Sequence, residues 1–279
     1  MLSTAPSNTM SQFYINGTHK FSPVTKLAMG MSQSHTTQNM AYVSDQLMSP
    51  GTVPATNLNG LVVASHYNAK LTHQYSKDLT LTAGYRLNDR DNRTGSNAYD
   101  FLAVNQIVGT AANYHAINTP VSVRRSQFDM AGDLKLDSQR NVRISLEDDA
   151  VDRKCTNALA NLPSAPASTQ NQGVATAYYT AGGVNSCVQV PHSRETKESV
   201  AYRARASDVL SYTMTYSHAD RKSDVNADYY NPMKADSEGV NIAGYMAYFQ
   251  ASRRQDALKA SVNWQASEQL DVTTSLKYG

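Results

Sequence analysis

The fold is decided by the segment Leu79-Thr80-Leu81-Thr82-Ala83-Gly84-Tyr85-Arg86-Leu87, in which odd-numbered positions are apolar or aromatic and even-numbered positions are small or polar. Successive side chains of a β-strand point to opposite faces of a sheet. The segment is therefore predicted to be a strand with one apolar face and one polar face.

The same alternation recurs along the chain. It is clear in residues 127–136, 142–147, 200–205, 210–217, 258–265 and 272–278, and weaker in residues 13–21, 27–31 and 63–75. Alternation of period two predicts about ten strands of roughly 9–14 residues, the length that a tilted membrane-spanning strand needs. No run of about 18 apolar residues is present, so a transmembrane helix is not expected.

The connections between these strands alternate in length. Short turns are predicted near residues 22–24, 76–78, 137–141, 207–209 and 266–269, and long polar segments near residues 33–60, 89–121, 149–196 and 218–254. Outer-membrane barrels have short periplasmic turns and long extracellular loops. We therefore expect an all-β fold, a transmembrane antiparallel up-and-down β-barrel segment, with a soluble β-sandwich or a secreted solenoid as the alternative.

The composition agrees with a wall between lipid and water. Charged residues make up 17% of the 279 residues, below the roughly 25% of a typical soluble domain, and tyrosines number 17. The formal net charge of +2 gives no electrostatic footprint for nucleic acid, so no nucleic-acid partner is expected. A secreted β-sandwich could share this composition, which alone does not decide the class.

The chain ends suggest a larger barrel. The first residues lack the basic and apolar regions of a signal peptide, and the last ones, Leu270 to Gly279, stop within a strand pattern. We expect residues 1–279 to be a single β-barrel segment, an internal part of a larger barrel, although ten strands could close a small one.

The polar face of the predicted strands carries many charged side chains. Thirteen charged or titratable residues are predicted to face the lumen: Lys20, Lys26, His66, Lys70, Arg86, Asp129, Asp133, Lys135, Arg143, Glu147, Arg203, Arg205 and Lys259. A narrow barrel would force these groups to pair tightly, whereas a wide barrel leaves room for water or a guest protein. An ordinary hydrated wall and a dedicated protein-binding lining both remain open.

Three stretches, together with the opening of the chain, resemble a known family. The three stretches are residues 83–94 (AGYRLNDRDNRT), residues 216–224 (YSHADRKSD) followed by 229–232 (YYNP), and residues 253–264 (RRQDALKASVNW). The opening of the chain is represented by residues 5–10 (APSNTM) together with residues 27–32 (LAMGMS). In this order and spacing they resemble the MtrB/PioB family of decahaem-associated outer-membrane β-barrels. The family commonly has a Cys-x-x-Cys near the mature N-terminus and is more than twice as long, and this chain departs from it in both respects.

The resemblance implies a location in the bacterial outer membrane and a role in electron transfer. Such a barrel is a sheath around a periplasmic multihaem c-type cytochrome, often docks a second multihaem cytochrome outside the cell, and carries no haem itself. The expected partners are thus the cytochrome in the lumen, an extracellular cytochrome and outer-membrane lipid. A passive outer-membrane porin or transporter channel is the alternative.

The residues offer little chemistry of their own. Cys155 and Cys187, the only cysteines, lie in one predicted extracellular loop, where a disulfide is permitted and would stabilise by roughly 3–4 kcal/mol. Two free thiols are the alternative. A Cys-x-x-Cys-His haem site, a close histidine pair, a calcium loop and a nucleophile elbow are all missing from the sequence. No catalytic, cofactor-binding or metal site is expected on this chain, and it is not expected to be an enzyme.

Overall fold

The computed structural model describes residues 8–41, 56–96, 98–102, 113–117, 120–155, 188–225 and 251–279, without the side chains of 98–102 and 113–117. Ten strands form one large sheet: β1 (Thr9–Ser22), β2 (Thr25–Gln38), β3 (Gly60–Gln74), β4 (Leu79–Asn92), β7 (Val121–Lys135), β8 (Arg140–Cys155), β9 (His192–Ser207), β10 (Leu210–Ser223), β11 (Arg253–Ser267) and β12 (Leu270–Tyr278). A separate two-stranded ribbon consists of β5 (Ala98–Leu102) and β6 (Asn113–Ile117). No helix in this described part is long and apolar enough to cross a membrane.

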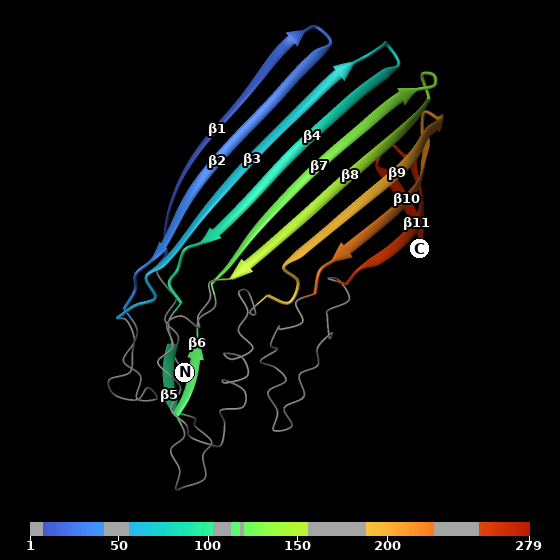
Figure 1. The fold of residues 1–279 in the computed structure, drawn as a ribbon. Coiled ribbons are helices and arrows are strands. Elements are labelled where there is room, and N and C mark those ends of the chain that lie inside the picture. The colour runs from blue at the N-terminus through green and yellow to red at the C-terminus, as the bar shows by residue number, and fades with distance from the viewer. Residues whose placement is uncertain are drawn as a thin grey trace.

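The large sheet is a simple up-and-down meander. Each strand pairs with the next one of the sheet, and every pairing is antiparallel. All the short turns lie at one end of the sheet, and the ends that lead into the long segments lie at the other (Figure 1). The predicted all-β, antiparallel, up-and-down architecture with ten strands is confirmed.

The five short turns share one piece of local chemistry. In each, a serine or aspartate at the strand end accepts a hydrogen bond from the backbone N–H two residues later. The acceptors are Ser22, Ser76, Asp137, Ser207 and Ser267, at 2.8–3.4 Å. A side chain that replaces a backbone acceptor in this way closes the turn locally, which explains why these residue types mark the turns in the sequence.

The strands are longer than the alternation pattern predicted. Segments 33–60, 89–121, 149–196 and 218–254, which were expected to be long loops, begin and end in strand. Thus β4 runs to Asn92 and β8 to Cys155, while β9 already begins at His192. The prediction of loop at these positions was wrong because both faces of the strand become polar there, so that no hydrophobic alternation marks them.

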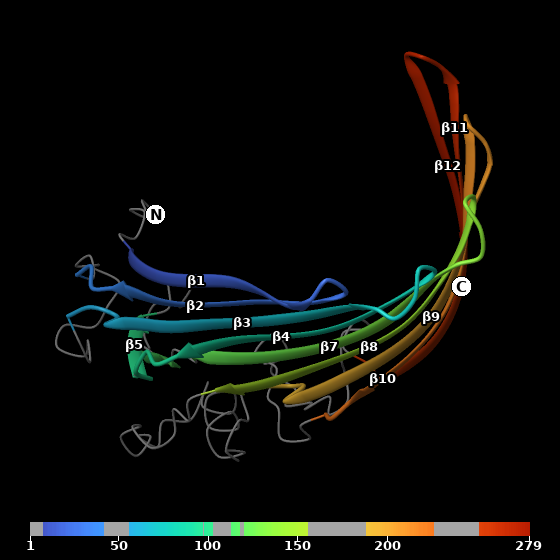
Figure 2. The same ribbon diagram turned by 90° about the horizontal axis from the view of Figure 1, so that it is seen from above.

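The sheet is a single curved layer rather than a closed ring. Seen from above it forms an arc, with β1 and β12 as its two edges (Figure 2). No side chain among the described residues is both large and fully buried, and the few buried apolar groups are mostly small, such as Ala131, Ala201 and Ala204. A sheet without a core on either side depends on its surroundings to cover its apolar face.

Candidate functional site

The register of the sheet sorts the side chains into two faces. On β4 and β7, Arg86 lies opposite Gln127, and Gly84 lies opposite Asp129. On β7 and β8, Asp129 in turn lies opposite Glu147. Because directly opposed residues share a face, the partners can be followed across all ten strands. We call the face that contains Arg86 the polar face and the other the apolar face.

All thirteen residues predicted to face the lumen lie on the polar face. The register places on one face Lys20, Lys26, His66, Lys70, Arg86, Asp129, Asp133, Lys135, Arg143, Glu147, Arg203, Arg205 and Lys259. That the polar face lines a lumen stays a prediction, because the described sheet does not close on itself.

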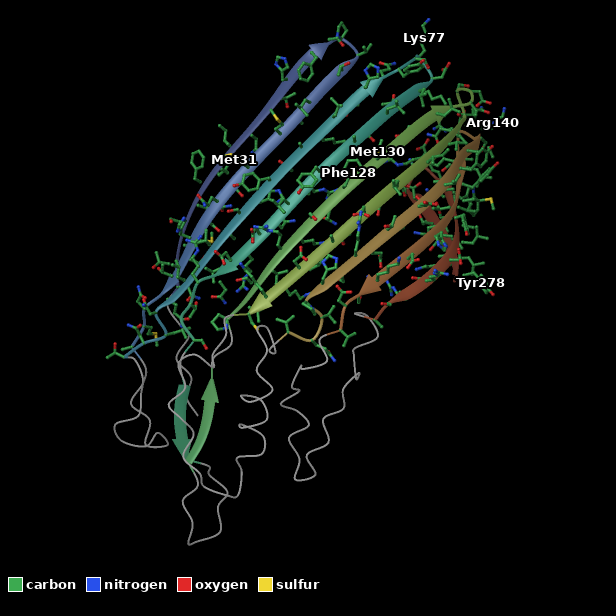
Figure 3. The ribbon with its side chains drawn as sticks, in the orientation of Figure 1. Met31, Lys77, Phe128, Met130, Arg140 and Tyr278 are labelled. Atoms are coloured by element: carbon green, nitrogen blue, oxygen red, sulfur yellow. The ribbon has the colours of Figure 1, made fainter. Side chains whose placement is uncertain are left out.

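The apolar face exposes a continuous band of large hydrophobic side chains. Phe128 is 40% exposed and Met130 48% exposed at the middle of β7, and Tyr85 lies directly opposite Phe128 on β4. Figure 3 labels both β7 residues, together with Met31 on β2 and Tyr278 on β12. An exposed apolar surface that crosses ten strands is far larger than a soluble monomer carries and marks a surface that contacts lipid.

The height of this band fits a membrane. On β4 the apolar face is hydrophobic from Leu79 to Leu87 and then turns charged at Asp89 and Asp91. Nine residues at about 3.3 Å each, tilted by about 40°, span about 23 Å, close to the roughly 25 Å of apolar band on outer-membrane barrels. The strands therefore continue past the membrane on the side of the long segments.

Beyond the band, the apolar face becomes a ladder of ionic contacts. The Arg124 guanidinium donates to Asp89 at 2.9 Å, and Arg194 donates to Asp148 at 2.9 Å. Further along the sheet, His192 contacts Asp152 at 2.6 Å, and Arg254 donates to Asp220 at 3.2 Å. These pairs join neighbouring strands in the segments where the sequence predicted loop.

One carboxylate in this ladder is strongly held. The Tyr216 hydroxyl donates to Asp256 at 2.7 Å, and the His218 ring lies 2.8 Å from the same oxygen. These contacts, the Tyr216 hydrogen bond above all, lower the pKa of Asp256. At the opposite end of the sheet, the Arg140 guanidinium likewise holds the pKa of the Asp137 carboxyl in the β7–β8 turn below its usual value.

The polar face carries its own ion pairs, mostly between neighbouring strands. Arg125 donates twice to Asp149, at 2.8 and 2.6 Å, and Glu195 accepts from Arg221 at 2.7 Å and lies 3.5 Å from Arg253. Five of the predicted lumen residues also pair: Arg86 with Asp129 at 3.4 Å, Arg143 with Asp133 at 2.5 Å, and Glu147 with Lys197 at 3.7 Å. Lys135, Arg203, Arg205 and Lys259 have no ion-pair partner among the described residues.

Several charged residues of the polar face were missed from the sequence. They are Arg90, Arg125, Asp149, Arg153, Glu195, Lys197, Arg221, Arg253, Asp271 and Lys277. Most lie in the segments that were assigned to loops or next to them. Side chains still alternate between the two faces here, as Glu195, Lys197 and Ser199 share the polar face. The intervening residues are polar too, so hydropathy does not distinguish one face from the other.

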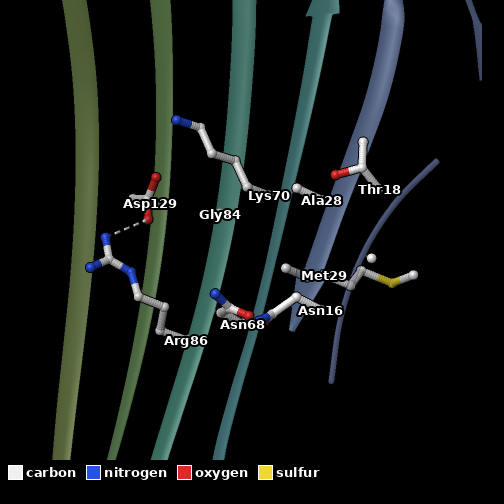
Figure 4. A pocket seen from close by; sticks show the side chains of 11 residues that line it. Asn16, Thr18, Ala28, Met29, Asn68, Lys70, Gly84, Arg86 and Asp129 are labelled. Atoms are coloured by element: carbon white, nitrogen blue, oxygen red, sulfur yellow. Dashed lines mark hydrogen bonds and ion pairs between the residues drawn. The ribbon is translucent and has the colours of Figure 1, made fainter. Parts of the chain in front are cut away.

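A shallow recess in the polar face lies over β2, β3 and β4 (Figure 4). Its floor consists of small residues, including Ala28 and Gly84. A Cβ at Gly84 would lie 2.5 Å from a carboxylate oxygen of Asp129. The absence of a side chain at Gly84 therefore leaves space over β4 for the Asp129 carboxylate, which lies 3.4 Å from Arg86. The recess is lined by amides, one lysine and this ion pair, without a nucleophile beside a base.

The remaining predicted site is the disulfide. Cys155 is buried at the end of β8. Cys187 lies outside the described residues, so the pairing of the two stays a prediction. In the described ranges, no three His, Cys, Asp or Glu side chains gather into a set that could hold a metal ion.

Comparison with known proteins settles the family. The profile of the family described as "Putative outer membrane beta-barrel porin, MtrB/PioB" matches residues 1–279, the whole chain. The chain belongs to the MtrB/PioB family. This membership confirms the resemblance found in the sequence, and it identifies the wall described above as that of an outer-membrane β-barrel.

Solved structures support the same fold at low sequence identity. The alcaligin outer-membrane receptor FauA from Bordetella pertussis is 11% identical with a TM-score of 0.53, over 96% of this chain and 35% of the receptor. The siderophore receptor PirA from Acinetobacter baumannii is 9% identical with a TM-score of 0.51, over 98% of this chain and 34% of that one. The MtrB/PioB chain thus spans about a third of the length of these barrels. No curated protein matches it significantly by sequence.

Proposed function

We propose that this MtrB/PioB chain forms part of a barrel sheath that houses a periplasmic multihaem c-type cytochrome and supports electron transfer across the outer membrane. The observation that carries the proposal is the open arc of ten strands. Barrel diameter grows with strand number, and only a wide barrel leaves space for a guest rather than for side chains alone.

The open edges support a wall of more strands. β1 and β12 lie at the two edges of the described sheet, and each unpaired backbone group in lipid costs several kcal/mol. We infer that further strands pair with these edges, so that residues 1–279 are one segment of a larger barrel. The similarity to about a third of two larger barrels agrees with that arrangement.

The division of labour between wall and guest follows from the side chains. The polar face is hydrated and charged, and the described part of the chain brings no nucleophile, base and orienting group together as a catalytic set. In the proposed complex the wall acts as an insulator around its guest. Haem is carried by the cytochrome, and a second multihaem cytochrome outside the cell would meet the barrel at the end of the long segments.

The test is isolation of the complex. The full-length protein, tagged at an exposed terminus, is extracted from outer membranes in mild detergent and analysed for covalently bound haem. The proposal expects a multihaem c-type cytochrome at a fixed ratio to the barrel, and transfer of electrons to a dye trapped in liposomes that contain the pair. A barrel that is always isolated free of haem protein would refute it.

A passive porin is the second candidate, favoured by the word porin in the family description. The two functions differ in what fills the lumen. A porin conducts ions in planar bilayers as isolated from the membrane, whereas a sheath conducts only after its guest has been removed.

A further inference from the structure

We propose that the polar face, from the short turns to the middle of the strands, is a docking surface for an acidic protein face. This inference rests on the proposed function, in which the occupant is the periplasmic cytochrome. We call the surface the cationic surface. It consists of Lys20, Lys26, Lys70, Lys135, Arg203, Arg205, Lys259 and Lys277.

The first observation is that these eight charges are uncompensated. All eight side chains are exposed, and none of them makes an ion pair within the described part of the chain. The acids of the same face are already engaged: Asp129, Asp133, Glu147, Asp149 and Glu195 each pair with an arginine or lysine. Among the described strands, Asp271 is the one polar-face acid without such a partner.

The second observation is direct opposition of like charges. Lys20 lies opposite Lys26 across β1 and β2, and Lys259 lies opposite Lys277 across β11 and β12, in both cases without an acid among the described residues that pairs with them. Other opposed cations have such an acid: Arg221 and Arg253 share Glu195, and Arg194, opposite Lys222, donates to Asp148. Like charges in opposed positions destabilise a sheet. A carboxylate of a partner placed between two such lysines would turn the repulsion into two attractions.

The third observation is the uneven distribution of charge along the strands. Towards the long segments, cations of the polar face lie beside carboxylates, as Arg125 does with Asp149 and Arg221 with Glu195. Arg90 and Arg153 there donate to backbone carbonyls instead. The larger part of the uncompensated positive charge thus lies on the side of the short turns, which outer-membrane barrels place in the periplasm.

The cationic surface includes a depression next to one of the short turns. Lys135, Arg203 and Arg205 line a depression beside the β7–β8 turn. The turns themselves carry Lys77, Arg140, Asp78, Asp137, Asp208 and Glu268, of which Asp137 and Arg140 pair with each other. These few turn acids do not offset the eight cations beside them. An acidic face entering from the periplasm would be attracted and oriented before contact.

The chemistry favours a protein over lipid. The cationic surface lies on the face opposite the apolar band, so anionic headgroups of the surrounding bilayer cannot reach it. A folded acidic face presents several carboxylates at fixed spacing, which matches charges that are distributed over seven of the ten strands.

The experiment compares two double variants in the full-length protein, each of which removes two exposed lysines. K20Q/K26Q removes an opposed pair from the cationic surface. K154Q/K222Q is the matched control, because Lys154 and Lys222 lie on the apolar face beyond the band. The cytochrome is released, purified and titrated back onto each barrel from about 0.05 to 0.5 M NaCl.

We expect K20Q/K26Q to raise the apparent Kd about 3- to 10-fold at low salt, with the control within about 2-fold of the parent. The difference should shrink as salt rises. The empty K20Q/K26Q barrel should unfold no more easily than the parent, because a repulsion has been removed, and this excludes misfolding as the cause.

Equal affinities for both variants, or affinity that does not respond to salt, would overturn the docking surface while leaving the sheath intact. An empty barrel whose anion selectivity falls in K20Q/K26Q with unchanged cytochrome affinity would likewise overturn it, since the charges would then serve small anions. Failure of the parent barrel to bind any haem protein would instead refute the proposed function.

Discussion

Met130→Arg tests the assignment of the two faces directly. Met130 lies on the apolar face of β7, six residues from Arg124, where that face turns charged, and six from Leu136 in the short turn. Six residues at about 3.3 Å, tilted by about 40°, place it about 15 Å from each of these two residues, and therefore near the midplane of the bilayer. An arginine there should lower the free energy of unfolding by about 2–4 kcal/mol.

The assay is denaturant unfolding of the full-length protein refolded into liposomes, followed by tryptophan fluorescence or by heat modifiability on gels. Gln127→Arg is the control, because Gln127 lies on the polar face of the same strand opposite Asp149. It should change the free energy of unfolding by less than about 0.5 kcal/mol. If the Gln127 variant were the damaged one and the Met130 variant neutral, the assignment of apolar face to lipid would be wrong.

Three further predictions concern single contacts. Gly84→Ala should displace the Asp129 carboxylate and lower the free energy of unfolding by about 0.2–1 kcal/mol in the same assay. A loss above about 2 kcal/mol would contradict this reasoning, which holds that the flexible Asp129 side chain can move away from the new methyl group. Cys155→Ser should lower the free energy of unfolding by about 3–4 kcal/mol. Under non-reducing, denaturing conditions the parent should show no reactive thiol and the variant one, and two reactive thiols in the parent would rule out the disulfide. Asp256 has a lowered pKa, chiefly through the Tyr216 hydroxyl. Its contribution to stability is therefore present above the ordinary aspartate pKa and is lost as pH falls through the lowered value. Thermal unfolding of the parent and Asp256→Asn should differ at pH 6, and this difference should shrink as pH falls below about 4; a constant difference would contradict the reasoning.

The faces and the turns could be predicted from the sequence because both depend on local chemistry. The alternation of residues 79–87 predicts which side chains share a face, without knowledge of the partner strands. A serine or aspartate that follows a strand predicts the position of a turn, as Ser76 and Asp137 do. Neither inference needs long-range information.

The outer ends of the strands could not be predicted, because their stability comes from partners far away in the sequence. Asp89 on β4 is held by Arg124 on β7, and Asp148 on β8 by Arg194 on β9. In the sequence each of these residues looks like a solvated loop charge. Glu195 could not be predicted for the same reason. It contacts Arg221 and Arg253, and these contacts depend on the register of three strands.

The two faces of the wall differ in how their charges are arranged, and the difference reflects their surroundings. On the apolar face beyond the band, charges of both signs lie on adjoining strands, as at Asp220 and Arg254, so this surface is compensated without a partner. On the polar face near the short turns, Lys20 and Lys26 oppose one another without an acid between them. The opposed cations Arg194 and Lys222 of the apolar face differ from this pair, because Arg194 donates to Asp148. An opposed pair without an acid weakens the sheet, and its position on the side of the short turns is what we expect if an acidic guest supplies the missing carboxylates.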